Sequence, residues 1–310
     1  MKILISDKLQ EEGIQIFQDN GFDVITNFKI TNDELIKEIE EYDGIVIRSR
    51  TKLTAEVLEN AKNLKVIGRA GVGLDNIDLH KAGKLNIEVL NTPEAPAITV
   101  AEFALGLMFS LARHIPNADK TMHTGQWNKS QYLGYTLNGK KLGLIGFGNI
   151  AKALAKRALA LGMIVGVYSR FSKGPQAIEE AKEMGCKVYS SIDELLKDVQ
   201  IISLHLPATP KTENIIDVNK FKLMKQNSII INTARGKLID DNALLAALKN
   251  GEIAGAALDV FREEPLKNEE FINFEGRLIL TPHIASQSEE NQIQAAIMIA
   301  EKISNFLKAK

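Results

Sequence analysis

The sequence predicts an α/β protein with two doubly wound parallel-sheet domains, on the strength of three observations. Short apolar runs alternate with amphipathic segments of about 10 to 15 residues, which is the pattern of parallel strands joined by crossover helices. The same alternation restarts after Lys140. The chain of 310 residues is also longer than one hydrophobic core usually organises.

The first predicted domain contains strands separated by helical patterns. We expect strands at residues 2–6, 22–25, 44–47, 64–68 and 86–90, with amphipathic helices over 9–17, 33–39 and 55–58. A long apolar helix over 98–114 follows, with Pro96 just before it and Pro116 just after it. This helix is too apolar for a solvated linker, so we expect it to pack in the seam between the domains and partly against a second subunit.

The second predicted domain begins its strands after Lys140. We expect strands at 142–146, 164–168, 200–206, 228–233 and 253–260, each followed by a helical pattern or a turn. A final helix is expected over 289–307, because apolar residues recur there on one face.

Composition argues against several classes of protein. Lys and Arg number 38 against 39 Asp and Glu, so no overall basic field exists to hold nucleic acid or an anionic membrane. The longest apolar stretch, 101–112, contains Glu102 and is well short of the roughly 20 residues that span a bilayer. The single cysteine, Cys186, cannot form an internal disulfide and no signal-peptide pattern opens the chain, so we expect a cytoplasmic protein.

A glycine-rich sequence, GFGNIA at 146–151, follows the strand at 142–146 and opens an amphipathic helix. In this strand-to-helix context the pattern predicts a dinucleotide-binding loop, the alternative being a tight glycine turn without a ligand. Gly146 permits the turn and Gly148 lets the backbone approach a pyrophosphate. Asn149 and Ile150 begin the helix, whose free N–H groups bind that anion.

The end of the next strand bears on the choice of dinucleotide. NAD-binding loops usually have an acid about 20 residues further on, which binds the ribose 2′-hydroxyl. Here the strand at 164–168 is followed by Ser169, Arg170 and Lys173, and the next acid is Glu179. A hydroxyl beside two cations suits a 2′-phosphate, so we expect NADP(H) to be used at least as well as NAD(H). The alternative is that the two cations are solvated and Ser169 holds the ribose.

Three titratable residues follow strands of the second domain, namely Arg235, Glu264 and His283. Ligands of open parallel sheets bind outside the carboxyl ends of the strands, so we expect these side chains to converge. The motifs around them are GLIGFGNIA at 143–151, SLHLPATPKT at 203–212, INTARGKLID at 231–240, AALDVFREEP at 256–265 and TPHIAS at 281–286. With these motifs in this order, the chain resembles the D-isomer-specific 2-hydroxyacid dehydrogenases over essentially its full length.

The resemblance implies a role for each of the three residues. Arg235 would bind the substrate carboxylate and polarise the keto oxygen, because its fork of donors matches a carboxylate. His283 would donate the proton in ketone reduction and accept it in alcohol oxidation, a task suited to a side chain that titrates near neutral pH. Glu264 would hold the other imidazole nitrogen and stabilise the imidazolium. Without the surrounding motifs, an arginine or glutamate in a loop is usually a solvated charge.

The resemblance also implies nested domains and further cofactor contacts. A Rossmann NAD(P)-binding domain at 98–286 would be inserted into a flavodoxin-like substrate domain at 1–97 and 287–310, with no metal ion. The further cofactor contacts implied are His205, Leu206, Pro207, Thr212, Thr233, Ala234, Asp259 and Ala285. Asp259 would face the nicotinamide carboxamide, and Thr233 and Ala234 would flank its ribose. For His205 the alternative is a strand-end histidine without a ligand.

Two loops of the first domain bear on the substrate, and the sequence of the second, GRAGVGLDNID with NTP soon after it, looks most like the phosphoglycerate dehydrogenase branch of the family. IRSRTKL at 47–53 carries Arg48 and Ser49, and GRAGVGLDNID at 68–78 carries Arg69. In that branch the two arginines would bind a phosphate, the alternative being surface ion pairs. The backbone N–H groups expected to bind the substrate carboxylate are those of Ala70, Gly71, Val72 and Gly73. Arg50 departs from the branch, where a small residue is usual, so its role is open.

Three functions therefore stay open. The leading one is oxidation of 3-phosphoglycerate to 3-phosphooxypyruvate, which opens serine biosynthesis, by a homodimer. The second is reduction of glyoxylate or hydroxypyruvate with NADPH, which Ser169 and Arg170 favour. The third is a dinucleotide-sensing, corepressor-like protein on the same fold, against which the set of Arg235, Glu264 and His283 argues. Because the chain stops at Lys310, we expect no regulatory third domain and no feedback inhibition by serine.

Overall fold

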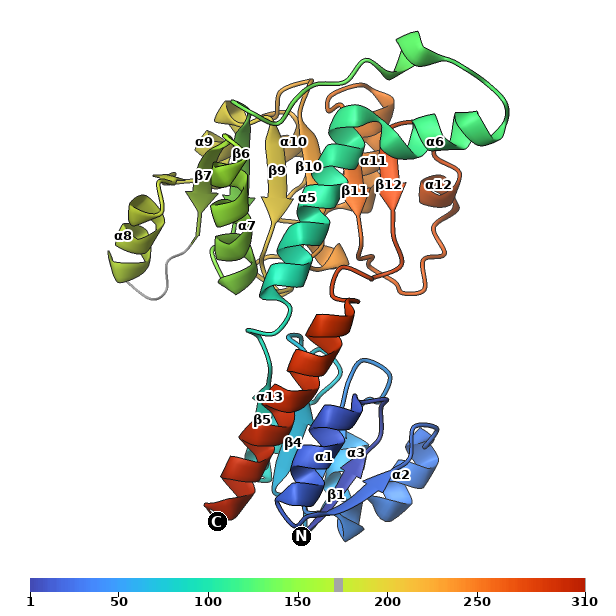
Figure 1. Cartoon of the computed structure of the whole chain (residues 1–310), viewed down its shortest axis with the longest axis vertical. Helices are drawn as coiled ribbons and strands as arrows, with labels where there is room; N and C mark the ends of the chain where they lie inside the picture. Colours follow the sequence, from blue (N-terminus) through green and yellow to red (C-terminus); the bar gives the residue numbers. More distant parts are fainter. Residues whose placement is uncertain (170–174, 310) are drawn as a thin grey trace. The chain divides into compact units, whose positions relative to one another are not determined.

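The computed structural model describes residues 1–169 and 175–309, which form two compact units. The first unit is Met1–Pro96 with Gln287–Lys310, and the second is Ala97–Ser286. Each contains one parallel β-sheet with helices on both faces (Figure 1). The expected α/β class with two parallel-sheet domains is confirmed.

The first unit has a five-stranded sheet in the order β2-β1-β3-β4-β5. The strands are β1 (Lys2–Ile5), β2 (Asp23–Thr26), β3 (Gly44–Ile47), β4 (Val66–Arg69) and β5 (Glu88–Asn91). Its helices are α1 (Glu11–Asp19), α2 (Asn32–Glu38), α3 (Ala55–Glu59), α4 (Leu79–Lys84) and α13 (Glu289–Lys308), with a 3-10 turn at Ile39–Glu41. This strand order is that of flavodoxin-like folds.

Alternate residues of the central strands pack on opposite faces of this sheet. Ile3 and Ile5 belong to the core formed with α1 and α13, whereas Leu4 belongs to the core formed with α2, α3 and α4. The long helix α13 comes from the end of the chain and packs on α1 and β4 (Figure 1). A Cβ at Gly68 would lie 2.2 Å from Ile303, so this glycine admits α13 to the sheet.

The second unit has a seven-stranded sheet in the order β12-β11-β10-β9-β6-β7-β8. The strands are β6 (Lys141–Ile145), β7 (Ile164–Tyr168), β8 (Lys187–Val188), β9 (Ile201–Leu204), β10 (Ile229–Asn232), β11 (Gly255–Leu258) and β12 (Leu278–Leu280). The helices are α5 (Ala97–Arg113), α6 (Ile115–His123), α7 (Asn149–Ala160), α8 (Pro175–Glu183), α9 (Ile192–Asp198), α10 (Val218–Phe221), α11 (Asp241–Lys249) and α12 (Glu269–Ile272), with 3-10 turns at Lys129–Tyr132 and Gly236–Leu238.

Both sheets reverse their strand order once, the first between β1 and β3 and the second between β6 and β9. Helices leave the strands toward opposite faces on the two sides of such a point, which opens a crevice at the carboxyl ends of the strands. Ligand-binding loops are therefore expected after β1 and β3 in the first unit and after β6 and β9 in the second.

The apolar helix expected over 98–114 is present as α5, which ends at Arg113, and His114 separates it from α6. This residue has φ +55°, the left-handed conformation, and α6 follows α5 at an angle of 64°. Buried residues of α5 belong to the core that also contains α7, within the second unit. Among the described residues no single helix is long and apolar enough to cross a membrane, and α5 with α6 meets that requirement only when the bent pair is counted together.

Candidate active site

His283 and Glu264 form a hydrogen-bonded pair in the second unit. His283 Nδ1 lies 2.7 Å from Glu264 Oε2, and the two side chains are 49% and 38% exposed. An ionised carboxylate only accepts hydrogen bonds, so Nδ1 carries a proton, and in the neutral imidazole Nε2 is then an acceptor. The other oxygen, Glu264 Oε1, accepts a hydrogen bond of 3.0 Å from the amide of Phe261. His283 has φ +54°, a strained conformation of the kind that concentrates at functional sites.

Asp259, one residue after β11, holds the loop that carries His283. Its side chain is buried, and Oδ1 accepts hydrogen bonds from Thr281 Oγ1 at 2.6 Å and the Ile284 amide at 2.8 Å. Oδ2 accepts a third from the Ala285 amide at 2.8 Å. Both carboxylate oxygens thus have donors within the protein. The carboxylate fixes the backbone on both sides of His283.

The loop of Arg235 is fixed by Asn232, the last residue of β10. The buried Asn232 side chain accepts a hydrogen bond from the Ala234 amide at 3.1 Å and donates one to the Arg235 carbonyl at 2.9 Å. Arg235 Nη1 donates to the carbonyl of Ala234 at 2.6 Å. A Cβ at Gly236 would lie 2.0 Å from the carbonyl carbon of Phe261, so the loops carrying Arg235 and Glu264 are in direct contact.

The glycine-rich turn has the form that a dinucleotide-binding loop requires. Gly146 has φ +102°, and a Cβ there would lie 2.3 Å from the carbonyl oxygen of His205, the residue after β9. Gly148 is the N-cap of α7, which begins with Asn149 and Ile150, and a Cβ at Gly148 would meet nothing within 4 Å. The amino end of this 12-residue helix is therefore open to an anion.

The buried hydroxyl of Thr233 also supports a dinucleotide-binding site in the second unit. Thr233 is buried, and its Oγ1 has no hydrogen-bond partner among the described residues. Such orphaned groups are rare in native proteins and call for a ligand or water. By contrast, the hydroxyl of Thr212 is engaged within its own loop, donating to the Pro207 carbonyl at 2.7 Å. The open helix end and the orphaned hydroxyl fit a nicotinamide dinucleotide across the carboxyl ends of β6, β9 and β10.

His205 stays uncharged at neutral pH in this structure. Atoms packed around its ring lower the pKa of His205 to about 4, although the residue is partly accessible to solvent. Its Nε2 lies 2.9 Å from Ser203 Oγ. Leu206, which follows, comes within 3.1 Å of a Cβ built at Gly146, and Pro207 is exposed.

The residues that would select the dinucleotide are only partly described. Ser169 directly follows β7, as expected. Arg170 and Lys173, on which the preference for NADP(H) depends, lie outside the described residues.

In the first unit, Arg48 follows β3, and its guanidinium is not paired with any residue that the structure describes. Among the described residues, its guanidinium makes no hydrogen bond or ion pair, and burial lowers the pKa of Arg48. The loop itself is firmly held, because Asp7 Oδ2 accepts from the Arg48 amide at 2.6 Å and Asn76 Nδ2 donates to the Arg48 and Thr51 carbonyls at 2.8 and 2.6 Å. Ser49 is exposed in the same loop. A partly buried cation on a rigid loop is suited to binding an anion.

Arg69 ends β4 and lies over the glycine turn that follows. A Cβ at Gly71, which has φ +144°, would lie 1.4 Å from Arg69 Nη1, so the missing side chain makes room for the guanidinium. The carbonyls of this turn are engaged, that of Gly71 by the Thr92 amide at 2.9 Å and that of Val72 by Asn91 Nδ2 at 2.7 Å. The amides of Gly71, Val72 and Gly73 make no hydrogen bond with the described residues.

One expectation about this turn needs correction. The amide of Ala70 donates to the Ile47 carbonyl at 3.0 Å. It continues the pairing of β3 with β4 one residue beyond the end of β4, so it is not a free donor for a substrate carboxylate.

Sequence reasoning missed three residues that hold these loops, Asp7, Asn76 and Asn232. Asp7 and Asn232 each end an apolar run, in ILISD and IIIN, and a polar residue at the carboxyl end of a buried strand is a signal that could have identified them. Asn76 stands in an irregular loop and carries no such signal.

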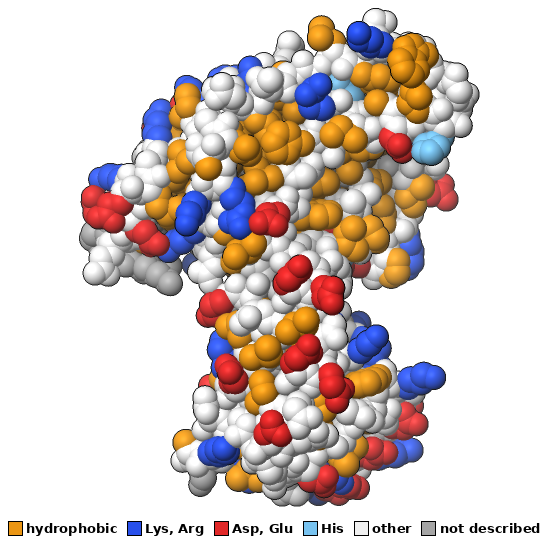
Figure 2. All heavy atoms as spheres, in the orientation of Figure 1, with side chains coloured by type: hydrophobic (Ala, Val, Ile, Leu, Met, Phe, Trp, Pro, Cys, Tyr) orange, Lys and Arg blue, Asp and Glu red, His pale blue; other side chains and the backbone are white. Residues whose placement is uncertain are grey.

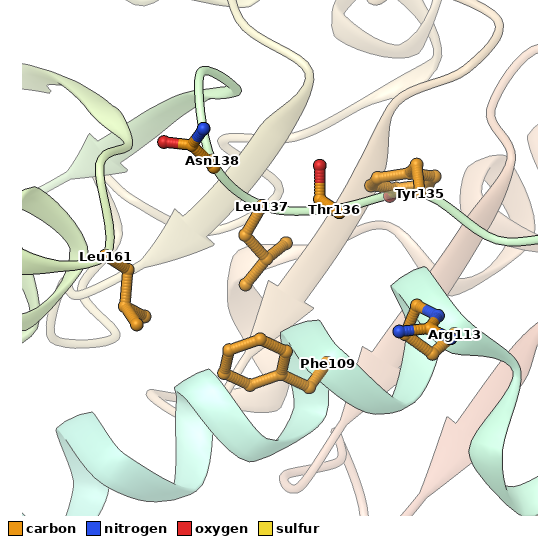
Figure 3. A pocket seen from close by; sticks show the side chains of 7 residues that line it. All are labelled: Phe109, Arg113, Tyr135, Thr136, Leu137, Asn138 and Leu161. Carbon is orange, nitrogen blue, oxygen red and sulfur yellow. The ribbon is translucent and has the colours of Figure 1, made fainter.

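A shallow pocket of about 220 Å³ lies elsewhere in the second unit, between α5 and the segment before β6 (Figure 3). It is lined by Phe109, Arg113, Tyr135, Thr136, Leu137, Asn138 and Leu161. None of the expected site residues lines this pocket.

Comparison with known proteins gives consistent results. The family model described as D-isomer specific 2-hydroxyacid dehydrogenase, NAD binding domain, matches residues 105–285. A D-3-phosphoglycerate dehydrogenase of Methanocaldococcus jannaschii is 44% identical over 100% of this chain, which spans 58% of that relative's length. A hydroxypyruvate reductase of Thermotoga maritima is 42% identical over 97% of this chain and 97% of its own.

A solved structure is similar over nearly the whole chain. It is the NAD+-bound 3-phosphoglycerate dehydrogenase of Entamoeba histolytica, with a TM-score of 0.82 and 28% sequence identity. The match covers 99% of this chain and 95% of the other.

Proposed function

The chain belongs to the D-isomer specific 2-hydroxyacid dehydrogenase family, and we propose on this premise that it is a D-3-phosphoglycerate dehydrogenase. It would interconvert 3-phosphoglycerate and 3-phosphooxypyruvate with a nicotinamide dinucleotide. The observation that carries the proposal is the 2.7 Å hydrogen bond from His283 Nδ1 to Glu264 Oε2. This bond leaves Nε2 to exchange a proton with the substrate oxygen.

The chain's own residues handle the proton and the charges. In oxidation, His283 Nε2 takes the hydroxyl proton of the substrate, and the Glu264 carboxylate stabilises the resulting imidazolium. In reduction, the same nitrogen returns the proton to the keto oxygen. Arg235 binds the carboxylate next to the reacting carbon and polarises the keto oxygen. The bound dinucleotide supplies or accepts the hydride.

Recognition of a phosphorylated acid would rest on the first unit. Arg48 has no ion-pair partner among the described residues, so binding a phosphate there breaks no existing ion pair. Arg69 stands at the end of the neighbouring strand β4. The amides of Gly71, Val72 and Gly73 would bind the substrate carboxylate.

The finer assignments of cofactor and assembly are also proposals. Ser169 and Arg170 favour NADP(H) over NAD(H), because a hydroxyl and a guanidinium suit a 2′-phosphate.

We expect a cytoplasmic homodimer. Figure 2 shows hydrophobic side chains over the face of the second unit on which α5 lies, and Trp127 and Leu133 in the segment after α6 are 79% and 88% exposed. A second copy of the chain would cover such a surface.

A second candidate function is reduction of hydroxypyruvate or glyoxylate. The observation that favours it is the similarity, over nearly equal lengths, to a protein named hydroxypyruvate reductase. The two functions differ in whether the site recognises a phosphate.

Steady-state kinetics with three keto acids and two cofactors tests the proposal. We expect kcat/KM to be highest for 3-phosphooxypyruvate, ahead of hydroxypyruvate and glyoxylate, and at least as high with NADPH as with NADH. Activity on glyoxylate with none on 3-phosphooxypyruvate would reverse the order of the two candidates. A ratio that favours NADH by more than about tenfold, or 1.4 kcal/mol, would refute the cofactor preference. A monomeric mass in light scattering would refute the dimer.

A further inference from the structure

We propose that Arg50 keeps the guanidinium of Arg48 available to the substrate by neutralising the carboxylate of Asp7, which makes Arg50 a positioning residue for phosphorylated acids. This inference rests on the proposed function, since it assumes that Arg48 binds the phosphate of the substrate. Arg50 would act through Asp7 and Arg48, without touching the substrate.

Asp7 lies two residues after β1, at the point where the strand order of the first sheet reverses. It is 5% exposed. Its Oδ2 accepts hydrogen bonds from the amides of Arg48 at 2.6 Å and Thr51 at 3.2 Å, and its Oδ1 accepts one from Thr51 Oγ1 at 2.7 Å. A buried carboxylate with these partners holds the loop after β3 in place.

These hydrogen bonds do not neutralise the charge of Asp7, because their donors are amides and a hydroxyl. The neutralising group is Arg50, whose Nε lies 3.0 Å from Asp7 Oδ1. A buried carboxylate without a cation is strongly unfavourable, so the pair has a physical reason to form.

The remaining donors of Arg50 keep its guanidinium against the protein. Nη2 donates to the Ser6 carbonyl at 2.5 Å and to Thr51 Oγ1 at 3.2 Å, and Nη1 donates to the Ile30 carbonyl at 3.0 Å. The side chain is 47% exposed, but its guanidinium is held by the segments that follow β1, β2 and β3. This geometry suits a fixed counter-charge better than a ligand that must reach a substrate.

The pairing of Arg50 with Asp7 affects the nearby cation of Arg48. Its guanidinium makes no ion pair with the described residues, yet the negative charge of Asp7 acts on it, opposing the effect of burial on its pKa. If Arg50 were absent, Asp7 would be uncompensated and would attract Arg48, in competition with a phosphate. With Arg50 in place, the charge of Asp7 is balanced and Arg48 retains its positive charge for an incoming anion.

The test compares Arg50→Met with the double variant Asp7→Asn/Arg50→Met, using 3-phosphooxypyruvate and hydroxypyruvate. We expect Arg50→Met to raise KM for 3-phosphooxypyruvate by about tenfold while kcat and the KM for hydroxypyruvate change less than about threefold. The double variant should return KM for 3-phosphooxypyruvate to within about threefold of wild type. Like Arg50→Met, the double variant lacks the hydrogen bonds of Arg50. A recovered KM for 3-phosphooxypyruvate would therefore be explained only by removal of the negative charge of Asp7.

Three further variants make the test specific. Arg50→Lys keeps the counter-charge and should stay within about threefold of wild type, even if Arg50→Met unfolds. Lys52→Met removes an exposed cation from the same loop and should leave both KM values unchanged. Arg48→Met should raise KM for 3-phosphooxypyruvate alone.

The Arg48→Met variant distinguishes failure of the proposed phosphate site from failure of the role of Arg50. If Arg48→Met leaves every KM at the wild-type value, the proposed phosphate site fails and this inference fails with it. If Arg48→Met raises KM but Arg50→Met does not, only the role of Arg50 is refuted. The role is also refuted if the double variant is no better than Arg50→Met, or if Arg50→Lys behaves like Arg50→Met.

Discussion

The imidazole of His283 is held by the carboxylate of Glu264 at 2.7 Å, although the two residues lie on loops that follow different strands, β12 and β11. The bond selects one tautomer of the imidazole and places a negative charge beside the ring. This is the arrangement that a reversible proton donor requires.

Replacement of His283 by Gln tests the pair directly. We expect kcat/KM to fall by about 10²- to 10⁴-fold, because the proton is no longer transferred by a positioned group. Glu264→Gln should cause a smaller loss and change the pH profile, since the imidazolium loses its counter-charge. Dinucleotide binding, followed by fluorescence, should stay within about threefold of wild type in both variants. Unchanged turnover in His283→Gln would support the corepressor-like alternative.

Asn232 is expected to set the position of Arg235. Asn232→Ala leaves the Ala234 amide without its acceptor and removes one of two donors to the Arg235 carbonyl, which keeps the Leu238 amide, at a cost of about 1–3 kcal/mol in the free energy of unfolding. KM for the keto acid should rise, because the loop of Arg235 loosens. Asn60→Ala is the control, since Asn60 bonds a backbone carbonyl on an exposed helix end. Equal effects of the two substitutions on both stability and KM would contradict the role of Asn232.

The two glycines of the dinucleotide loop should respond differently to alanine. Gly146→Ala is expected to unfold or strongly destabilise the protein, because of its φ of +102° and a clash at 2.3 Å with His205. Gly148→Ala meets no atom within 4 Å, so the protein should fold with a similar midpoint of thermal unfolding. It should nevertheless weaken dinucleotide binding by about tenfold, since the methyl group stands where the backbone approaches the pyrophosphate. Wild-type affinity in Gly148→Ala would place the dinucleotide elsewhere.

His205 should make stability depend on pH in acid. Burial lowers its pKa from 6.5 to about 4, so the unfolded chain binds a proton more readily than the folded one between these values. The contribution is fully present above about pH 6.5 and is lost as the pH falls toward 4, by at most about 3 kcal/mol. His205→Gln should flatten this part of the profile in urea unfolding at pH 7, 6, 5 and 4.5. Parallel profiles for variant and wild type would contradict the prediction.

The sequence predicted the fold class well because strand and helix periodicities are local signals. The runs at 44–47 and 164–168 became β3 and β7 with the expected bounds. The end of α5 next to His114 agrees with the helix expected over 98–114, but the left-handed turn into α6 was not predicted, since such a conformation depends on packing around it.

The candidate site was only partly predictable. Motifs identified His283 and Glu264, and the structure brings their side chains together. Motifs did not reveal that Asp259, Asn232 and Asp7 hold the loops, because those contacts join residues far apart in the chain or depend on local turn geometry. The amide of Ala70 was misjudged for the same reason, as its partner Ile47 lies on another strand.

The most direct test of the central claim is the ratio of kcat/KM for 3-phosphooxypyruvate to that for hydroxypyruvate, two substrates that differ by one phosphate. For the wild-type protein we predict a ratio of at least about ten, since charge-assisted contacts to a phosphate contribute more than 1.4 kcal/mol. A ratio of one or less would contradict the account and assign the chain to the reductases of unphosphorylated acids.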